Sequence, residues 1–157
     1  MNLDFAEKPA GEALTFWVPG RPAPGGSKRF VGIGKKTGRA ILIDAAGERN
    51  KEWRASVAYC ASLLAPAELM RGPLEVAFEF TMPRPKGHFH TSKKRAGELR
   101  EDAPTHPTSK PDVLKLARST EDALTSVIWA DDAQTVKLTA TKQYGDKPGC
   151  KITITQL

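Results

Sequence analysis

Three aspartates in the last third of the chain have the clearest potential for chemistry. They are Asp112 and the adjacent pair Asp131 and Asp132. Mg²⁺ takes hard oxygen ligands, and carboxylates that hold it can polarise a phosphate and an attacking water, as phosphodiester cleavage requires. Each acid also has a purely structural explanation, because Asp is favoured at helix starts and in turns.

Whether these acids meet depends on the elements that position them. Residues 112–126 predict a helix whose inward stripe is Val113, Leu116, Ala117, Thr120, Leu124 and Val127. About twelve helical residues at ~1.5 Å each carry the chain ~18 Å away from Asp112. An extended segment over residues 125–132, at roughly 3.3 Å per residue, is long enough to return along the helix and place Asp132 near Asp112.

The rest of the chain predicts one ordinary domain. Alternating apolar and polar residues predict strands at 14–18, 74–82, 135–141 and 151–157. Two short runs around GKKTG predict a hairpin over residues 30–43 with a basic tip. Residues 46–64 predict a second helix, with one face formed by Trp53, Val57, Cys60 and Leu64.

The expected fold class is therefore α/β (mixed), a single domain in which a mixed β-sheet is packed by two main helices. We expect residues 1–13 to be a flexible N-terminal tail and residues 14–157 to form the domain. Residues 84–110 have no apolar period, and a loop of that length is usually functional or mobile. We interpret them as a loop that faces the substrate.

Composition makes a polyanionic partner plausible. The chain has 24 Lys and Arg against 18 Asp and Glu, a formal charge of +6, and the cations gather in residues 28–39 and 84–100. A solvated surface is the alternative for such charge runs. Neither a run of about 18 apolar residues nor a signal peptide is present, so we expect a cytoplasmic protein. The two cysteines are expected to be reduced.

Other candidate motifs are weaker. GIGKKTG lacks phosphate-loop spacing, because Arg29 and Lys36 stand where Gly and Ser or Thr are needed, so no nucleotide cofactor is expected. His88, His90 and His106 fit solvated loop histidines better than a zinc site. Trp129 fits core packing better than intercalation into bases.

The run KPDVLKLARSTEDALTSVIWADDAQTVKLTATK resembles the RusA family of Holliday junction resolvases. In that family a KPD, a DAL and a W-x-DD-x-Q-V occur in this order. The segments FWVPGRPAPGGSKRF and FEFTMPRPK are similar to the family's first strand with its basic turn and to a later strand. The resemblance spans residues 14–157, and its specific motif lies in the last third.

The resemblance implies a metal site at Asp112 and Asp132, with Asp131 beside the second ligand. The family has D-x-D at the helix start, and Leu114 replaces the second of those carboxylates here. Asp131 is the preferred substitute, ahead of Glu121, which lies about 10 Å along the helix axis from Leu114.

Further departures concern the two positions that follow. Lys115 stands at a family asparagine, and Arg118 stands at the catalytic lysine. A guanidinium is a poor proton shuttle, so the role of Arg118 would be to stabilise negative charge that develops on a phosphate.

By this resemblance, the chain is expected to be a Mg²⁺- or Mn²⁺-dependent endodeoxyribonuclease. It would resolve four-way junctions or other branched DNA by paired cuts, as a homodimer with no membrane association. A branched-DNA-binding protein with the same fold, its catalysis weakened or lost through Leu114, is the alternative. Genes of this family are often carried by phages or prophages. The expected phosphate contacts are Lys28, Arg29, Lys35, Lys36, Lys93, Lys94 and Lys142.

Overall fold

The computed structural model describes residues 11, 13–25, 28–44 and 47–157. Most of the predicted N-terminal tail, residues 1–10 and 12, lies outside the described residues. The strands and helices are β1 (Leu14–Pro19), β2 (Lys28–Ile33), β3 (Ala40–Asp44), α1 (Gly47–Ser62), β4 (Leu74–Met82), α2 (Val113–Leu124), β5 (Thr135–Tyr144) and β6 (Gly149–Gln156). Three short 3-10 turns are η1 (Lys86–His88), η2 (Lys93–Arg95) and η3 (Asp132–Gln134).

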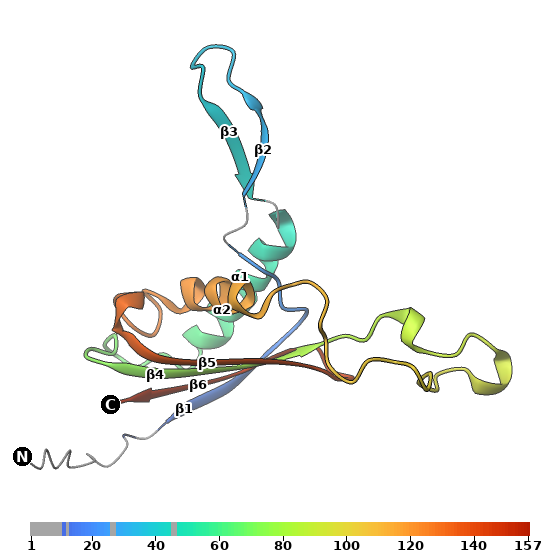
Figure 1. Ribbon diagram of the computed structural model, residues 1–157. Coiled ribbons are helices and arrows are strands. Elements are labelled where there is room, and N and C mark those ends of the chain that lie inside the picture. The colour runs from blue at the N-terminus through green and yellow to red at the C-terminus, as the bar shows by residue number, and fades with distance from the viewer. Residues whose placement is uncertain (1–10, 12, 26–27, 45–46) are drawn as a thin grey trace, which may run out of the picture.

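Four strands form a mixed sheet in the order β1-β6-β4-β5. β4 and β5 are parallel, whereas β6 pairs antiparallel with both β1 and β4. Parallel neighbours need a crossover, and α2 provides it between β4 and β5. Figure 1 shows α1 and α2 over the same face of this sheet. The predicted α/β class, with a mixed sheet and two helices, is confirmed.

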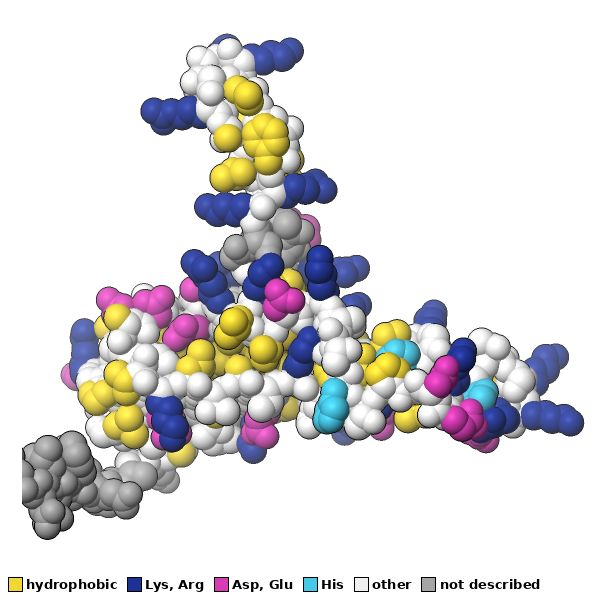
Figure 2. Space-filling model, in the orientation of Figure 1, with side chains coloured by type: hydrophobic (Ala, Val, Ile, Leu, Met, Phe, Trp, Pro, Cys, Tyr) yellow, Lys and Arg dark blue, Asp and Glu magenta, His cyan; other side chains and the backbone are white. Residues whose placement is uncertain are grey.

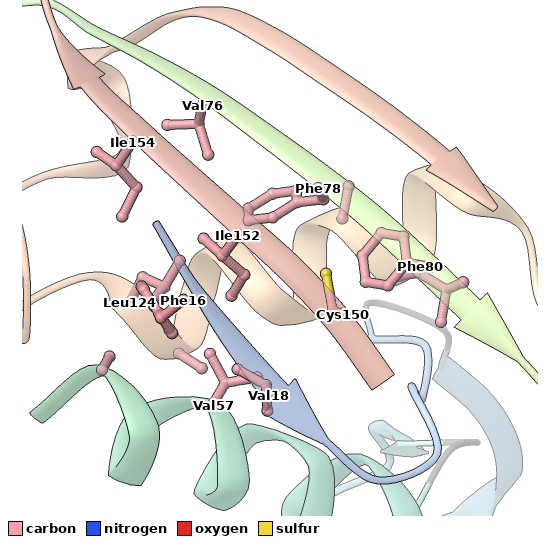
Figure 3. Close-up of a cluster of buried hydrophobic side chains, with 14 of the residues drawn as sticks. Phe16, Val18, Val57, Val76, Phe78, Phe80, Leu124, Cys150, Ile152 and Ile154 are labelled. Atoms are coloured by element: carbon pink, nitrogen blue, oxygen red, sulfur yellow. The ribbon is translucent and has the colours of Figure 1, made fainter. Parts of the chain in front are cut away.

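The core lies between that face and the two helices. Every second residue of β4 from Leu74 to Phe80 is fully buried, as the alternation in the sequence predicts. Figure 3 shows Val76, Phe78 and Phe80 beside Ile152 of β6, with Val57 of α1 closing the cluster. In the described part of the chain, no helix is long and apolar enough to cross a membrane.

Two details of the predicted core differ from the structure. Leu64 lies beyond the end of α1 and is exposed, and Ala61 completes the buried stripe instead. Trp129 is fully buried, as core packing predicts, and its Nε1 donates to Thr125 Oγ1 at 3.2 Å. Trp53 Nε1 donates to Thr120 Oγ1 at 3.0 Å, which fastens α1 to α2.

Two projections leave this body in different directions (Figure 1). One is the hairpin formed by β2 and β3, which pair only with each other in a separate two-stranded sheet. The other, here called the arm, comprises residues 83–111 between β4 and α2 and contains η1 and η2. The arm is the long loop that the sequence predicts.

Candidate metal and nucleic-acid site

Asp112 is the residue that precedes the first turn of α2, but its side chain makes no capping hydrogen bond. Its Oδ2 lies 3.6 Å from Lys115 Nζ, and both side chains are about half exposed. An exposed pair at this distance contributes little to stability. The helix start therefore does not use the Asp112 carboxylate, which stays accessible to a ligand.

Lys142 holds the segment that leads into Asp112. Its Nζ donates to Ser109 O at 2.8 Å and to Pro111 O at 2.9 Å. An ammonium has three donors, so two of them serve the protein's own backbone. The predicted phosphate contact at Lys142 thus has a clear structural role, because these bonds tie the start of α2 to the far end of β5.

At the other end of α2, Glu121 lies close to Asp132. Partial burial raises the pKa of the Glu121 carboxyl above its ordinary value, and the Thr135 hydroxyl opposes that shift. The negative charges of Asp132 and Asp122 raise the Glu121 pKa further. Two carboxylates near enough to repel each other form a place where a cation would relieve the repulsion.

Asp131 is committed to local structure. Its Oδ1 accepts from Ala133 N at 2.8 Å and caps η3. In return, Gln134 Oε1 accepts from Asp131 N and Ala130 N, both at 3.0 Å. Asp131 therefore has the structural role in a turn that the sequence offered as its alternative. One of its carboxylate oxygens, Oδ1, already accepts a hydrogen bond.

Gln134 is a residue that the sequence interpretation missed. Its Nε2 donates to Met70 O and Gly72 O, both at 3.0 Å, so one side chain joins η3 to the segment before β4. The D-x-x-Q spacing of a capping box at Asp131 is the signal that could have found it.

The predicted extended return of residues 125–132 is wrong. The chain instead curls at the end of α2, where Ser126 has a φ of 67° and its N–H donates to Trp129 O at 2.7 Å. Ile128 N–H donates to Leu124 O at 2.9 Å, and Ile128 O accepts from Met70 N at 2.8 Å. These contacts keep Asp132 at the C-terminal end of the helix.

β5, instead of residues 125–132, is the segment that runs back along α2 toward its N-terminal end. It starts with Thr135, beside Glu121, and reaches Lys142, beside Pro111. Seven strand residues cover about 23 Å. Asp112 and Asp132 of one chain therefore lie toward opposite ends of α2, and the described residues include no group of three or more His, Cys, Asp or Glu that could hold a metal ion.

The outer face of α2 carries Leu114 and Arg118, four residues apart and hence on one side of the helix. Leu114, at the position of the missing carboxylate, is 74% exposed. Arg118 is also exposed and has no ion pair with any side chain that the structure describes. A cation without a partner thus lies one turn before Glu121.

The predicted phosphate contacts are spread over both projections. Lys28, Arg29, Lys35 and Lys36 are exposed on the hairpin, and Lys93 and Lys94 are exposed in η2 of the arm. Figure 2 shows Lys and Arg side chains at the outer ends of both projections. The cations of the hairpin and those of the arm therefore lie on separate projections of the fold.

A further basic surface surrounds a cavity of about 480 Å³ next to Asp112. Arg21, Arg49 and Lys110 line it, together with Trp53 and Pro111. The three cations come from separate segments, so no charge run in the sequence could reveal them.

Two of the three arm histidines, His88 and His90, are partly buried, whereas His106 is exposed, as expected of a solvated loop residue. His88 is half-buried and meets the Tyr144 ring edge to face, with 5.4 Å between ring centroids. His90 Nε2 lies 3.3 Å from Glu101 Oε2. Both histidines therefore help to pack the arm.

Comparison with known proteins adds a family match. The family described as "Endodeoxyribonuclease RusA" matches residues 19–155. The chain is also similar to an uncharacterized protein, YqaN, of Bacillus subtilis (strain 168), with 30% identity over 146 residues. That alignment covers 93% of this chain and 98% of the relative. α2 and both projections lie inside the matched range.

Proposed function

Because the chain belongs to the RusA family of endodeoxyribonucleases, we propose that it cuts branched DNA with a divalent metal at the C-terminal end of α2. The observation that carries this proposal is the placement of half-buried Glu121, in the last turn of α2, near Asp132, which begins η3. Burial is the main cause of the raised pKa of Glu121, and the charge of Asp132 adds to it. Mg²⁺ commonly binds through one or two carboxylates plus substrate phosphates, which is the donor set that this pair offers.

Each residue of this site has a distinct role. Glu121 and Asp132 hold the cation, and Glu121 is a better ligand than Asp131, whose Oδ1 is engaged with Ala133 N. When bound, Mg²⁺ or Mn²⁺ supplies polarisation of the phosphodiester and activation of water. Arg118, one turn before Glu121, is suited to stabilise negative charge on the phosphate.

A homodimer would bring the distant Asp112 to this pair. An antiparallel, two-fold arrangement of α2 helices places the start of one helix beside the end of the other, so each site would combine residues of two copies. Exposed apolar side chains support a contact along this side of the molecule. Leu114 is 74% exposed on α2, and Val136 and Leu138 are 63% and 42% exposed on the edge strand β5.

A labelled four-way junction tests the cleavage proposal. With Mg²⁺ or Mn²⁺, we expect symmetrical nicks from the native protein and a loss of about 100-fold or more in Asp132→Asn, with junction binding retained. Asp131→Asn is the matched control, because an amide oxygen can still cap η3, and it should cut at the native rate.

The exposed Leu114 favours a second candidate, a branched-DNA-binding protein without catalysis. Absence of nicks from the native protein, together with tight junction binding, would select this candidate. Cleavage gained by Leu114→Asp would then identify the missing carboxylate as the reason.

Mixed dimers test whether the site is shared between copies. Asp112→Asn and Asp132→Asn would be coexpressed with different tags, and the mixed dimer purified. If Asp112 serves the partner's site, a mixed dimer keeps one unaltered site and nicks a single strand. Should each site lie within one chain, every site of the mixed dimer is defective, and no nicking returns.

A further inference from the structure

The hairpin exposes an unusual amount of apolar surface for a projecting element. Six of its side chains, Phe30, Val31, Ile33, Ile41, Leu42 and Ile43, are between 42% and 64% exposed. Figure 2 shows hydrophobic side chains along the shaft of the hairpin, with Lys and Arg side chains above and below them. Exposed apolar clusters of this kind mark interaction surfaces.

The strand register places these side chains on both faces of the ribbon. Phe30 pairs with Leu42, so both point to one face, whereas Ile43 pairs with Arg29 on the other. The register shifts between Phe30 and Gly32, which makes Val31 the extra residue of a bulge. A bulge sharpens the local twist and redirects side chains. β2 and β3 pair only with each other, and the hairpin projects away from the main sheet (Figure 1).

The charges on the hairpin indicate what covers this surface. The hairpin contains five cations, with Lys28 and Arg29 at the base and Lys35, Lys36 and Arg39 toward the tip. Its one acid is Asp44, the last residue of β3, opposite Lys28 at the base. The apolar residues from Phe30 to Ile33, between Arg29 and Lys35, form a belt about 10 Å long at ~3.3 Å per residue. Within the described ranges, no ion pair involves the three cations toward the tip. A polyanion with apolar faces satisfies both features.

We propose that this hairpin enters the open centre of branched DNA, where Phe30, Ile33 and Leu42 contact bases that a continuous duplex keeps stacked. Apolar side chains of minor-groove proteins wedge between base steps in this way, and aromatic rings stack on bases. The cations at either end of the belt contact the flanking phosphates. The apolar belt thereby distinguishes branched from linear DNA. This inference rests on the proposed function, in which branched DNA is the substrate.

The test compares apolar and basic variants of the same hairpin. Binding to a four-way junction and to a linear duplex would be measured without metal, using Phe30→Ser/Leu42→Ser, the single variant Ile33→Ser, and Lys35→Ala/Lys36→Ala as the matched control. We expect the apolar variants to lose about 10-fold in their preference for the junction. The basic variant should weaken binding to both DNAs by similar factors and reduce the salt dependence.

A fluorescent base at the branch point shows whether the hairpin contacts bases, independently of how tightly the protein binds the junction. With 2-aminopurine at the branch point, saturating native protein and saturating Lys35→Ala/Lys36→Ala should raise its fluorescence equally, whereas the apolar variants should not. An unchanged junction preference, or full fluorescence with the apolar variants, overturns the inference. Dissociation of a native dimer into monomers by Ile33→Ser would also overturn it, since the belt would then contact a second copy.

The proposed function can fail separately from this inference. If the native protein nicks junctions and the apolar variants keep the native preference, only the role of the hairpin is wrong. If the native protein binds junction and duplex equally and cuts neither, branched DNA is not the substrate and both proposals are lost.

Discussion

The two ends of α2 differ in how firmly the chain holds their acids. At the C-terminal end, Trp129 is fully buried and Gln134 makes four side-chain hydrogen bonds around η3. At the N-terminal end, Asp112 is exposed, and Lys142 supplies the hydrogen bonds that hold the backbone before it. A rigid end suits a metal bound before DNA arrives, whereas an open end suits a ligand completed by a second copy.

The largest effect is expected from the C-terminal end. Gln134→Ala removes four hydrogen bonds and should lower the free energy of unfolding by about 2–4 kcal/mol, measured by urea denaturation. Gln143→Ala, at an exposed position of β5, is the control and should change it by less than about 0.5 kcal/mol. Equal effects of the two substitutions would show that the C-terminal end is no more rigid than the rest of the strand.

A substitution at the N-terminal end of α2 should lower the free energy of unfolding less. Lys142→Met keeps the aliphatic stem but removes two charge-assisted hydrogen bonds, which should lower the free energy of unfolding by about 1–2 kcal/mol. Amide hydrogen exchange in the first turn of α2 should become faster. Lys137 lies on β5, as Lys142 does, and its Nζ pairs with Glu75 Oε1 of the neighbouring strand β4 at 2.6 Å. Lys137→Met breaks only this largely exposed pair and should cost about 0.5 kcal/mol or less. Unchanged exchange in Lys142→Met would refute the anchoring role.

A smaller effect separates a cap from a metal ligand. Asp131→Ala should lower the free energy of unfolding by about 1 kcal/mol, because η3 loses its cap. Asp131→Asn retains an oxygen acceptor and should stay near the native stability. Titration of both variants with Mn²⁺ should show native affinity, and a large loss of affinity in Asp131→Asn would make Asp131 a ligand after all.

The smallest expected effect is a stabilisation, caused by a substitution of Glu121. Burial on folding raises the pKa of the Glu121 carboxyl above its value in the unfolded chain. The protonated carboxyl therefore favours the folded state, and this stabilisation is lost as the pH rises from the unfolded pKa through the folded pKa. Glu121→Gln should therefore stabilise the protein at pH 7 by a fraction of 1 kcal/mol, once solvent screening is allowed for, and the gain should vanish in acid.

Thermal unfolding between pH 3 and pH 8 would measure this effect, with Glu68→Gln as an exposed control. Mg²⁺ should stabilise the native protein more than Glu121→Gln, because a ligand stabilises the state that binds it. Equal stabilisation of both proteins would remove Glu121 from the site.

The elements were predictable from the sequence because local patterns specify them. The alternation in β4 follows from burial of one side of each pleat, and the stripe on α2 follows from its packing over the sheet. The course of residues 125–134 was not predictable, since long-range contacts such as Gln134 with Gly72 determine it. No periodicity in the sequence reports such a contact.

The candidate site was predictable in its residues and not in its geometry. Asp112, Asp132 and Glu121 were all identified from the sequence, but Asp131 was preferred over Glu121 because helix rise places Glu121 about 10 Å from Leu114, the position of the missing carboxylate. The curl after α2 keeps Asp132 at the end of the helix where Glu121 lies, and this is the reason that we propose Glu121 as the ligand.

The separation of the hairpin sheet from the main sheet also bears on how such proteins diverge. Core positions of β4 and β6 can change only if their neighbours change in step, because closely packed interiors penalise altered volumes. Hairpin residues face no such restriction from the core, so insertions and replacements there leave foldability intact. If the hairpin contacts branched DNA as proposed, natural selection can adjust which DNA structures are bound while the proposed metal site stays constant.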